Sequence, residues 1–357
     1  MKFYKKTSYT EDFRLFRDGT MAFWYAILGL MLLAAPALAP AYYLSQLVLI
    51  GIYVVAGAGL MLLCGYCGQI SLGHAAFFAV GAFTTTVLET HGIPFPAALL
   101  AAGLLAAVVG LIVGLPALRL SGMYLAIATL AAAFIVNEII VRWESVTNGS
   151  SGLRVPKIAL GGFVADSETK LYYIVLPIAL LAMLAVRNIV RAPLGLAMMA
   201  IRDSETAAQS MGIPLMRVKL TAFGLSALLT GVAGALYAHK IPFIDPDQFN
   251  ILLSIEFLVM IFIGGIGSMH GIVLGAIFVI ALPQLVAVAK DHLPAAIAQQ
   301  SGLQAAVYAA ILLVFILAEP TGLYGIWRKI KHYCSMFPFY RKGSLRRAKS
   351  FAKSETW

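Results

Sequence analysis

The chain has 357 residues, of which 61% are hydrophobic and only 12% are charged, whereas soluble domains are about half apolar and about a quarter charged. A mean hydropathy of +0.89 is sustained only when most of a chain lies in hydrocarbon, where lipid-facing surfaces are as apolar as the core. These values exclude a soluble enzyme with an ordinary hydrophilic surface and predict an all-α polytopic membrane protein.

The charge balance is basic, with 26 Lys and Arg against 16 Asp and Glu. A nucleic-acid partner would need a long hydrophilic stretch with a basic face, and the sequence has none. The cysteines Cys64, Cys67 and Cys334 are too few for a disulfide framework, and they lack the second pair that a tetrahedral metal site would need. We therefore expect no nucleic-acid partner and no metal.

Ten apolar runs of about 20 residues, the length that crosses a bilayer, follow one another along the chain. They cover residues 21–39, 42–64, 72–89, 95–117, 123–141, 171–186, 220–239, 251–266, 270–289 and 304–319. The sequence therefore predicts about ten transmembrane helices in one membrane domain, residues 21–327. A cytoplasmic amphipathic arm (residues 1–20) precedes this domain, and a basic tail (residues 328–357) follows it.

Lysine and arginine indicate which helix ends face the cytoplasm, because cytoplasmic loops carry an excess of both. With the amino terminus inside, 20 of the 26 fall on the inner side and 6 on the outer side. Both termini are then cytoplasmic, and the polar loop of residues 142–170 is periplasmic. The loop of residues 187–219 is cytoplasmic and predicts short helices, since Pro193 suits a helix start and Gly212 a helix end.

Five polar residues within or beside the apolar runs are candidates for lining a transport path: Ser71, His74, Asn137, Glu138 and Glu256. A charge at mid-bilayer costs at least a few kcal/mol, so such residues usually face the bundle interior or a water-filled cavity. The alternative is structural, with His74 a hydrogen-bonded packing residue and each carboxyl near a helix end or bonded to a neighbouring helix. A buried carboxyl can also bind and release a proton, so a proton-coupled secondary transporter is an alternative function.

Glycines recur at every fourth position at Gly267, Gly271 and Gly275. This spacing places them on one helical face and predicts close helix packing. Residues 268–271 also faintly echo residues 71–74, and both segments are predicted near the inner side.

Several catalytic motifs are missing. The chain has no G-x-x-x-x-G-K-[ST], no H-E-x-x-H and no G-x-S-x-G. Because the first is the phosphate-binding loop of P-loop ATPases and the others mark two classes of hydrolase, these activities are not predicted for the chain itself.

Three stretches resemble the LivM-type permease subunits of bacterial ABC importers for branched-chain amino acids. They are GYCGQISLGHAAFFAVGAF (residues 65–83), YLAIATLAAAFIVNEIIVRWESVTNGSSGL (residues 124–153), and the segment of residues 193–275 that begins PLGLAMMAIRDSETAAQSMGIPLMRVK. The resemblance implies the ABC importer permease fold, with ten helices per subunit, in the bacterial inner membrane.

The resemblance also implies partners. They are a sister permease of the LivH type, two ATP-binding subunits of the LivG and LivF type, and a periplasmic substrate-binding protein. The chain would then be a transport subunit without a cofactor, because ATP is bound by the partner subunits.

The segment ETAAQSMG resembles the E-A-A…G element through which importer permeases contact their ATPases. On this resemblance the coupling residues are Arg202, Asp203, Glu205, Ala207, Ala208 and Gly212. A small face would enter a cleft of the ATPase, and the charges would bond at its rim. We expect Glu205, Ala207 and Gly212 to be needed for transport but not for folding; an ordinary solvated amphipathic loop is the alternative.

The resemblance implies branched-chain or other apolar amino acids as substrates. Residues 148–152, NGSSG, lack the acidic residue expected in the outer loop, so a urea or short-amide permease of the same architecture stays open. The tail alternates basic and aromatic residues, which predicts contact with the anionic inner leaflet, with a solvated tail as the alternative.

Overall fold

The computed structural model describes residues 19–117, 120, 122–160, 163–290, 302–319 and 321–336. The long helices are α1 (Gly19–Leu38), α2 (Ala41–Leu60), α3 (His74–Thr90), α4 (Phe95–Ala117), α5 (Met123–Arg142), α7 (Glu168–Arg191), α10 (Leu215–Lys240), α11 (Ile251–Gly264), α12 (Met269–Lys290), α14 (Leu303–Ala318) and α15 (Gly322–Met336). The predicted arm lies outside the described residues except for its last two, and so does the tail beyond residue 336. Helix α15 runs across the predicted boundary between membrane domain and tail.

A helix coincides with each of the ten predicted spans, but not every helix is long enough to cross a membrane. Six in the described part of the chain are long and apolar enough, at Ala41–Tyr66, Phe95–Pro116, Met123–Arg142, Glu168–Arg191, Leu215–Lys240 and Met269–Ala289. The helices at Ala22–Leu38, Ile251–Gly264 and Ala305–Phe315 are apolar but shorter. The predicted all-α membrane fold is therefore confirmed, whereas the number ten is not.

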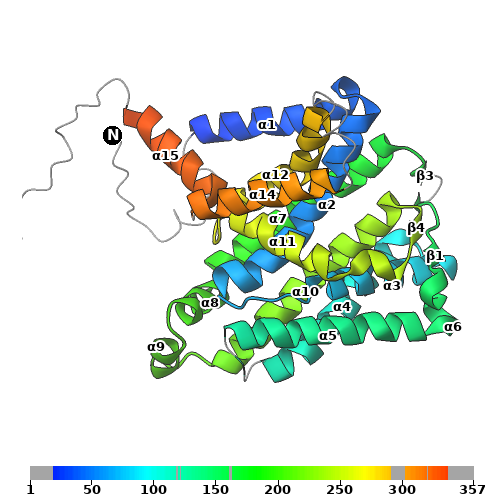
Figure 1. Cartoon of the computed structure of the whole chain (residues 1–357), viewed down its shortest axis with the longest axis horizontal. Coiled ribbons are helices and arrows are strands. Elements are labelled where there is room, and N and C mark those ends of the chain that lie inside the picture. Colours follow the sequence, from blue (N-terminus) through cyan, green and yellow to red (C-terminus); the bar gives the residue numbers. More distant parts are fainter. Residues whose placement is uncertain are drawn as a thin grey trace, which may run out of the picture.

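Helix α10 lies at the centre of the core and packs against α2, α3 and α4 (Figure 1). Glycines allow this close packing. A Cβ atom added to Gly234 would lie 1.9 Å from the Phe78 carbonyl oxygen of α3, and one added to Gly231 would lie 2.4 Å from Ala106 of α4. A side chain at either glycine would clash with the neighbouring helix. The helices therefore pack at the short distance that small interface residues allow.

Short strands lie at one end of the helical bundle, opposite the short helices α8 (Pro193–Asp203) and α9 (Glu205–Ser210) (Figure 1). Strand β1 (Leu153–Arg154) pairs antiparallel with β4 (Phe243–Ile244), and β2 (Ala159–Leu160) pairs with β3 (Phe163–Val164). The predicted periplasmic loop thus lies at the same end as the connection after α10, as the predicted topology requires. The short helical elements α6 (Glu144–Thr147), η3 (Gly149–Ser151) and η4 (Pro246–Phe249) belong to the same two segments.

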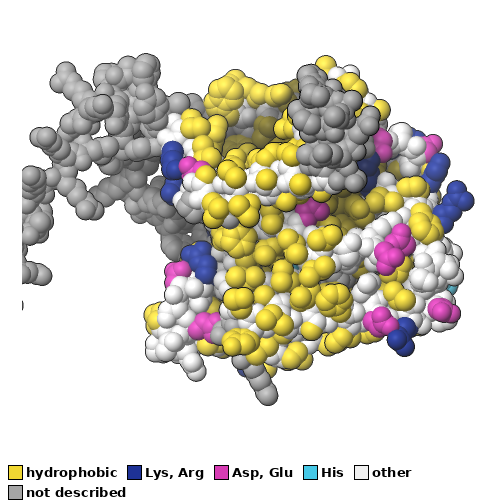
Figure 2. Space-filling model, viewed as in Figure 1, with side chains coloured by type: hydrophobic (Ala, Val, Ile, Leu, Met, Phe, Trp, Pro, Cys, Tyr) yellow, Lys and Arg dark blue, Asp and Glu magenta, His cyan; other side chains and the backbone are white. Residues whose placement is uncertain are grey.

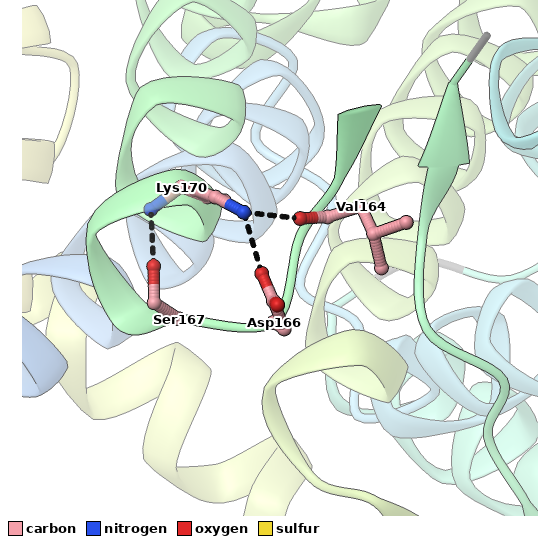
Figure 3. A network of polar contacts seen from close by, with 4 residues as sticks. All are labelled: Val164, Asp166, Ser167 and Lys170. Carbon is pink, nitrogen blue, oxygen red and sulfur yellow. Dashed lines mark hydrogen bonds and ion pairs between the residues drawn. The ribbon is translucent and has the colours of Figure 1, made fainter. Parts of the chain in front are cut away.

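A small polar network fixes the start of α7 at the strand end (Figure 3). The Lys170 ammonium donates to the Val164 carbonyl oxygen at 2.8 Å and to the Asp166 carboxylate at 2.6 Å, while the Ser167 hydroxyl caps the helix by accepting from the Lys170 amide. The hydrogen bond from Lys170 lowers the pKa of the Asp166 carboxyl below its ordinary value. This network anchors the predicted periplasmic loop to the membrane domain.

Partly buried and buried polar contacts join helices at the same end. The Lys240 ammonium at the end of α10 donates at 2.6 Å to both Glu168 of α7 and Ser45 of α2. His239 lies 3.3 Å from Glu89 of α3, and both side chains are buried. The end of α10 is therefore held by three neighbouring helices.

Two helix breaks occur at the end that carries α8 and α9. Helix α2 continues as a π-helix, Met61–Tyr66, and a turn follows before α3. Between α11 and α12 the backbone turns through Gly265 and Gly267, which have positive φ values of 112° and 77°. The prediction that Gly267 shares a helical face with Gly271 and Gly275 is therefore wrong, because a left-handed residue cannot continue an α-helix.

Gly271 and Gly275 do lie on α12 and approach α11. A Cβ atom on Gly275 would lie 2.1 Å from the Met260 carbonyl oxygen, and one on Gly271 would lie 2.7 Å from that of Gly264. Close contact between α11 and α12 therefore depends on two of the three predicted glycines.

Hydrophobic side chains cover the middle of the face drawn in Figure 2, and most charged side chains lie toward its two ends. Helix α5 carries many of the exposed apolar residues, including Tyr124, Ile127 and Phe134. Such a band is typical of a surface that meets lipid or a neighbouring membrane subunit.

Candidate functional site

The predicted coupling segment forms two short helices and a turn. Helix α8 begins at Pro193 and ends at Asp203, and Ser204 then caps α9 by accepting a hydrogen bond from the Ala207 amide at 3.2 Å. Gly212 follows with φ of 82°, a conformation that favours glycine, and α10 begins directly after Pro214. The short helices predicted from the proline and glycine positions are confirmed.

The two faces of α9 differ in a way that the sequence did not indicate. Ala207 and Gly212 are exposed, and Met211 is 70% exposed, whereas Ala208 is 0% exposed. The expectation that Ala208 belongs to a partner-facing small surface is therefore wrong, because its methyl group is buried in the chain's own core. The exposed surface of α9 consists of Thr206, Ala207, Gln209 and Ser210.

Two of the three charged residues of the segment, Arg202 and Asp203, pair with each other, and Glu205 pairs with α10. Arg202 donates to the Asp203 carboxylate and, through Nη1, to the Gly65 carbonyl oxygen at 3.1 Å. The Asp203 side chain is largely exposed. Glu205 accepts a hydrogen bond from Lys219 at 2.7 Å. All three side chains thus contact groups of their own chain, and Asp203 is the most exposed of them.

Sequence reasoning missed two contributors to this site, Lys219 and Gln69. Lys219 is the last residue of the predicted cytoplasmic loop of residues 187–219, but it lies within α10 with its side chain 4% exposed. Gln69, in the turn before α3, donates to Glu205 at 3.5 Å. They are separated from Glu205 by 14 and 136 residues and lie on different elements, so no local sequence pattern predicts either contact.

Ser71 and His74 lie together in a fully buried polar cluster. The His74 Nδ1 atom lies 3.1 Å from the Ser71 hydroxyl, and Nε2 lies 2.8 Å from the Ser226 hydroxyl of α10. Both ring nitrogens therefore have partners within the chain. This geometry matches the packing alternative for His74, whose ring joins α3 to α10 and contacts Ser71 in the turn before α3.

Asn137 and Glu138 lie near the end of α5. Glu138 is 57% exposed and pairs with Arg142 one turn later, whereas the Asn137 side-chain oxygen is buried without a hydrogen-bond partner among the described residues. Both residues border a shallow apolar depression together with Phe134, Ile135 and Trp143. These sequence neighbours therefore lie beside the same depression, with Glu138 exposed and the Asn137 oxygen buried.

Glu256 lies apart from them, on α11. It is partly buried and accepts a long hydrogen bond, 3.5 Å, from the Tyr53 hydroxyl of α2. Tyr237 and Tyr308 are close enough to interact electrostatically with its carboxylate. A carboxylate with one long hydrogen bond and several tyrosines nearby retains free capacity to accept from a donor group.

A comparison with protein families matches residues 42–318 to the permease component of the branched-chain amino acid transport system. The match covers more than half of the chain. The chain belongs to this permease family.

Three relatives of this permease are described as LivM proteins. The high-affinity branched-chain amino acid transport system permease protein LivM of Escherichia coli K12 is 34% identical over 259 residues, and that of Salmonella typhimurium is 33% identical. Both alignments cover 66% of this chain and 61% of the relative, so the chain spans less than two thirds of their length. A probable branched-chain amino acid transport permease protein LivM of Methanocaldococcus jannaschii is 25% identical, over 63% of this chain and 67% of the relative. No solved structure matches.

The described part of this permease family member contains no cluster of three or more His, Cys, Asp or Glu side chains that could hold a metal ion. Cys64 and Cys67 are both free and buried. The candidate site is therefore built from backbone turns, ion pairs and a small exposed helix.

Proposed function

We propose that this chain is a permease subunit of an ABC importer and forms, with a sister permease of the LivH type, a translocation path for branched-chain or other apolar amino acids. The observation that carries the proposal is the family match over residues 42–318. Separate LivG- and LivF-type subunits hydrolyse ATP, and a periplasmic binding protein delivers the substrate.

The exposed side of α9 is the proposed contact with an ATP-binding subunit. Thr206, Ala207, Gln209 and Ser210 present small or uncharged side chains, and Met211 adds a flexible apolar one. Small residues allow close approach, and methionine adapts to irregular pockets. Asp203 lies at the rim of this surface, where it can bond to a cationic partner group.

The translocation path is proposed to run beside α5 and α11. Glu138 pairs with Arg142 near the end of α5, and the Asn137 side-chain oxygen beside it has no hydrogen-bond partner among the described residues, so this face is proposed to meet the sister permease rather than lipid. Glu256, surrounded by tyrosines, is proposed to contact the ammonium group of a passing amino acid. Ser71 and His74 are assigned to packing because their hydrogen bonds are internal.

Orientation follows from the charge distribution. The end with α8 and α9 is proposed to be cytoplasmic and the strand end periplasmic, with both termini in the cytoplasm. The protein is an integral membrane protein with six helices of spanning length in its described part. The basic tail is proposed to lie on the inner leaflet.

Uptake by reconstituted vesicles tests the proposed substrate. The complete complex, with its binding protein, is given labelled leucine and labelled urea in parallel. We expect leucine uptake and little urea uptake; preferential urea uptake would instead favour a urea or short-amide permease. Glu256→Gln should slow leucine uptake with the complex intact, and Glu144→Gln, an exposed glutamate at the strand end, should not.

A further inference from the structure

Arg202, the penultimate residue of α8, lies where the coupling segment contacts the membrane helices. Its Nη1 atom donates to the Gly65 carbonyl oxygen at 3.1 Å, while Nε and Nη2 donate to the Asp203 carboxylate at 3.2 and 3.1 Å. The planar guanidinium therefore bonds to two groups at once. A lysine ammonium, as a point charge without this fork, cannot reproduce that geometry.

The first turn that Arg202 contacts, residues 65–68, comprises the last residues of the π-helix Met61–Tyr66 and the two residues after it. Gly68 in this turn has φ of 72°, and a Cβ atom there would lie 2.9 Å from Cγ of Arg202. The aliphatic part of Arg202 thus packs directly on the turn backbone. A single side chain holds the turn of residues 65–68 both by packing and by a hydrogen bond.

The second turn connects α11 to α12. A Cβ atom on Gly267 would lie 3.4 Å from Nη1 of Arg202, and a Cβ atom on Gly65 would lie 3.1 Å from the Gly267 amide nitrogen. The Gly267 amide also donates to the Met61 sulfur at 3.2 Å. The two membrane turns therefore touch each other, and the guanidinium lies against both.

A second contact holds α9 to the same region. Glu205 accepts from Lys219 at 2.7 Å and from Gln69 at 3.5 Å. Gln69 follows directly after the turn that Arg202 contacts. The coupling segment is consequently attached to this region on both sides of Ser204, once from the end of α8 and once from the start of α9.

We propose that Arg202 is a positioning residue that transmits movement of α8 and α9 to the two membrane turns, residues 65–68 and 265–268, rather than a contact for the ATPase. A shift of the coupling segment then moves the ends of α2, α3, α11 and α12 together. The proposal rests on the proposed function, since it assumes that an ATPase moves the segment.

Two substitutions in the complete reconstituted importer test this role. Arg202→Gln removes the charge and the fork, and Arg202→Lys keeps the charge but removes the fork. Arg217→Gln is the matched control, because Arg217 is an exposed arginine at the start of α10 near the same end of the bundle. Each complex is measured for bound ATPase, thermal stability, basal and binding-protein-stimulated ATP hydrolysis, and leucine taken up per ATP hydrolysed.

We expect both Arg202 variants to retain the ATPase subunits and basal hydrolysis and to lose roughly tenfold or more in leucine taken up per ATP, within the range of measured coupling free energies. Arg217→Gln should behave as the original protein does. If Arg202→Gln does not fold, Arg202→Lys decides the question alone.

Three outcomes would overturn the proposal. Loss of bound ATPase would make Arg202 a docking residue. Lower thermal stability with unchanged leucine uptake per ATP would make its role purely structural. An equal loss of leucine uptake per ATP in Arg217→Gln would show that the effect of the Arg202 variants comes from the change in charge alone. If the unmodified complex shows no ATP-driven uptake, the proposed function itself fails, which is a distinct result.

Discussion

Glu205 and Lys219 form an ion pair at 2.7 Å in which the lysine side chain is 4% exposed and the glutamate 38% exposed. The pair joins the first residue of α9 to α10. A buried ammonium group without a partner is costly, because no ion pair or hydrogen bond then compensates for the water it has lost. Glu205 therefore supports the folded structure, contrary to the expectation that it serves transport alone.

Replacing Glu205 with Ala should lower the stability of the chain. Loss of one partner from a fully buried pair costs about 3–5 kcal/mol, and the partial exposure of Glu205 reduces our expectation to about 1–3 kcal/mol. Thermal unfolding in detergent measures the change. The double variant Glu205→Leu with Lys219→Met should recover most of the loss; a single variant as stable as the original protein would show that the pair contributes nothing.

Adjacent alanines in α9 should respond differently to the same substitution. Ala208→Trp places an indole in the buried core, and overpacking typically costs about 1–3 kcal/mol. Ala207→Trp changes only the exposed surface, so the chain should fold normally while binding of the ATPase subunit weakens. Thermal unfolding and co-purification with the ATPase distinguish these effects. The assignment of faces is wrong if Ala208→Trp is stable and Ala207→Trp is not.

The different roles of these alanines show why the sequence predicts the coupling segment but not its faces. Proline, serine and glycine mark the start and end of α8 and α9 by local backbone chemistry, which a sequence displays. Helix α9 has only six residues, too few for apolar periodicity to indicate a buried side. The inward position of Ala208 comes from packing against the rest of the chain.

Lys219 and Gly267 illustrate two other failures. The sequence places Lys219 at the end of a basic loop. In the structure it is buried in α10, where its ammonium group pairs with Glu205. The four-residue glycine spacing suggests a continuous helix, but the positive φ of Gly267 places it in a turn. The all-α membrane class is predictable because hydropathy marks apolar helices, whereas apolar runs in the sequence do not determine how many of these helices are long enough to span.

Gly275 should be intolerant of any side chain. A Cβ atom there would lie 2.1 Å from the Met260 carbonyl oxygen, so Gly275→Ala must separate α11 from α12, at a cost of about 1–3 kcal/mol. Gly29→Ala is the control, since nothing lies within 4 Å of its added Cβ atom and alanine favours a helix by up to about 1 kcal/mol. Equal unfolding temperatures for the two variants would contradict the close packing.

His74 offers a test between packing and a place in the path. His74→Phe removes the ring nitrogen that contacts the buried Ser226 hydroxyl, whereas Ser71 still accepts from the Gly73 amide, and an unsatisfied buried polar group costs about 1–3 kcal/mol. We expect a lower unfolding temperature with an unchanged uptake rate per folded complex. Reduced uptake at unchanged stability would instead assign His74 to the path.

Measuring which energy source drives leucine uptake tests the account most directly. Vesicles that contain this chain, its sister permease and both ATP-binding subunits are supplied with the binding protein and labelled leucine, with either ATP on the ATPase side or a proton gradient alone. The account predicts uptake that requires ATP and stops when the ATP-binding subunits are inactivated. Uptake driven by the proton gradient without ATP would contradict it and identify a secondary transporter.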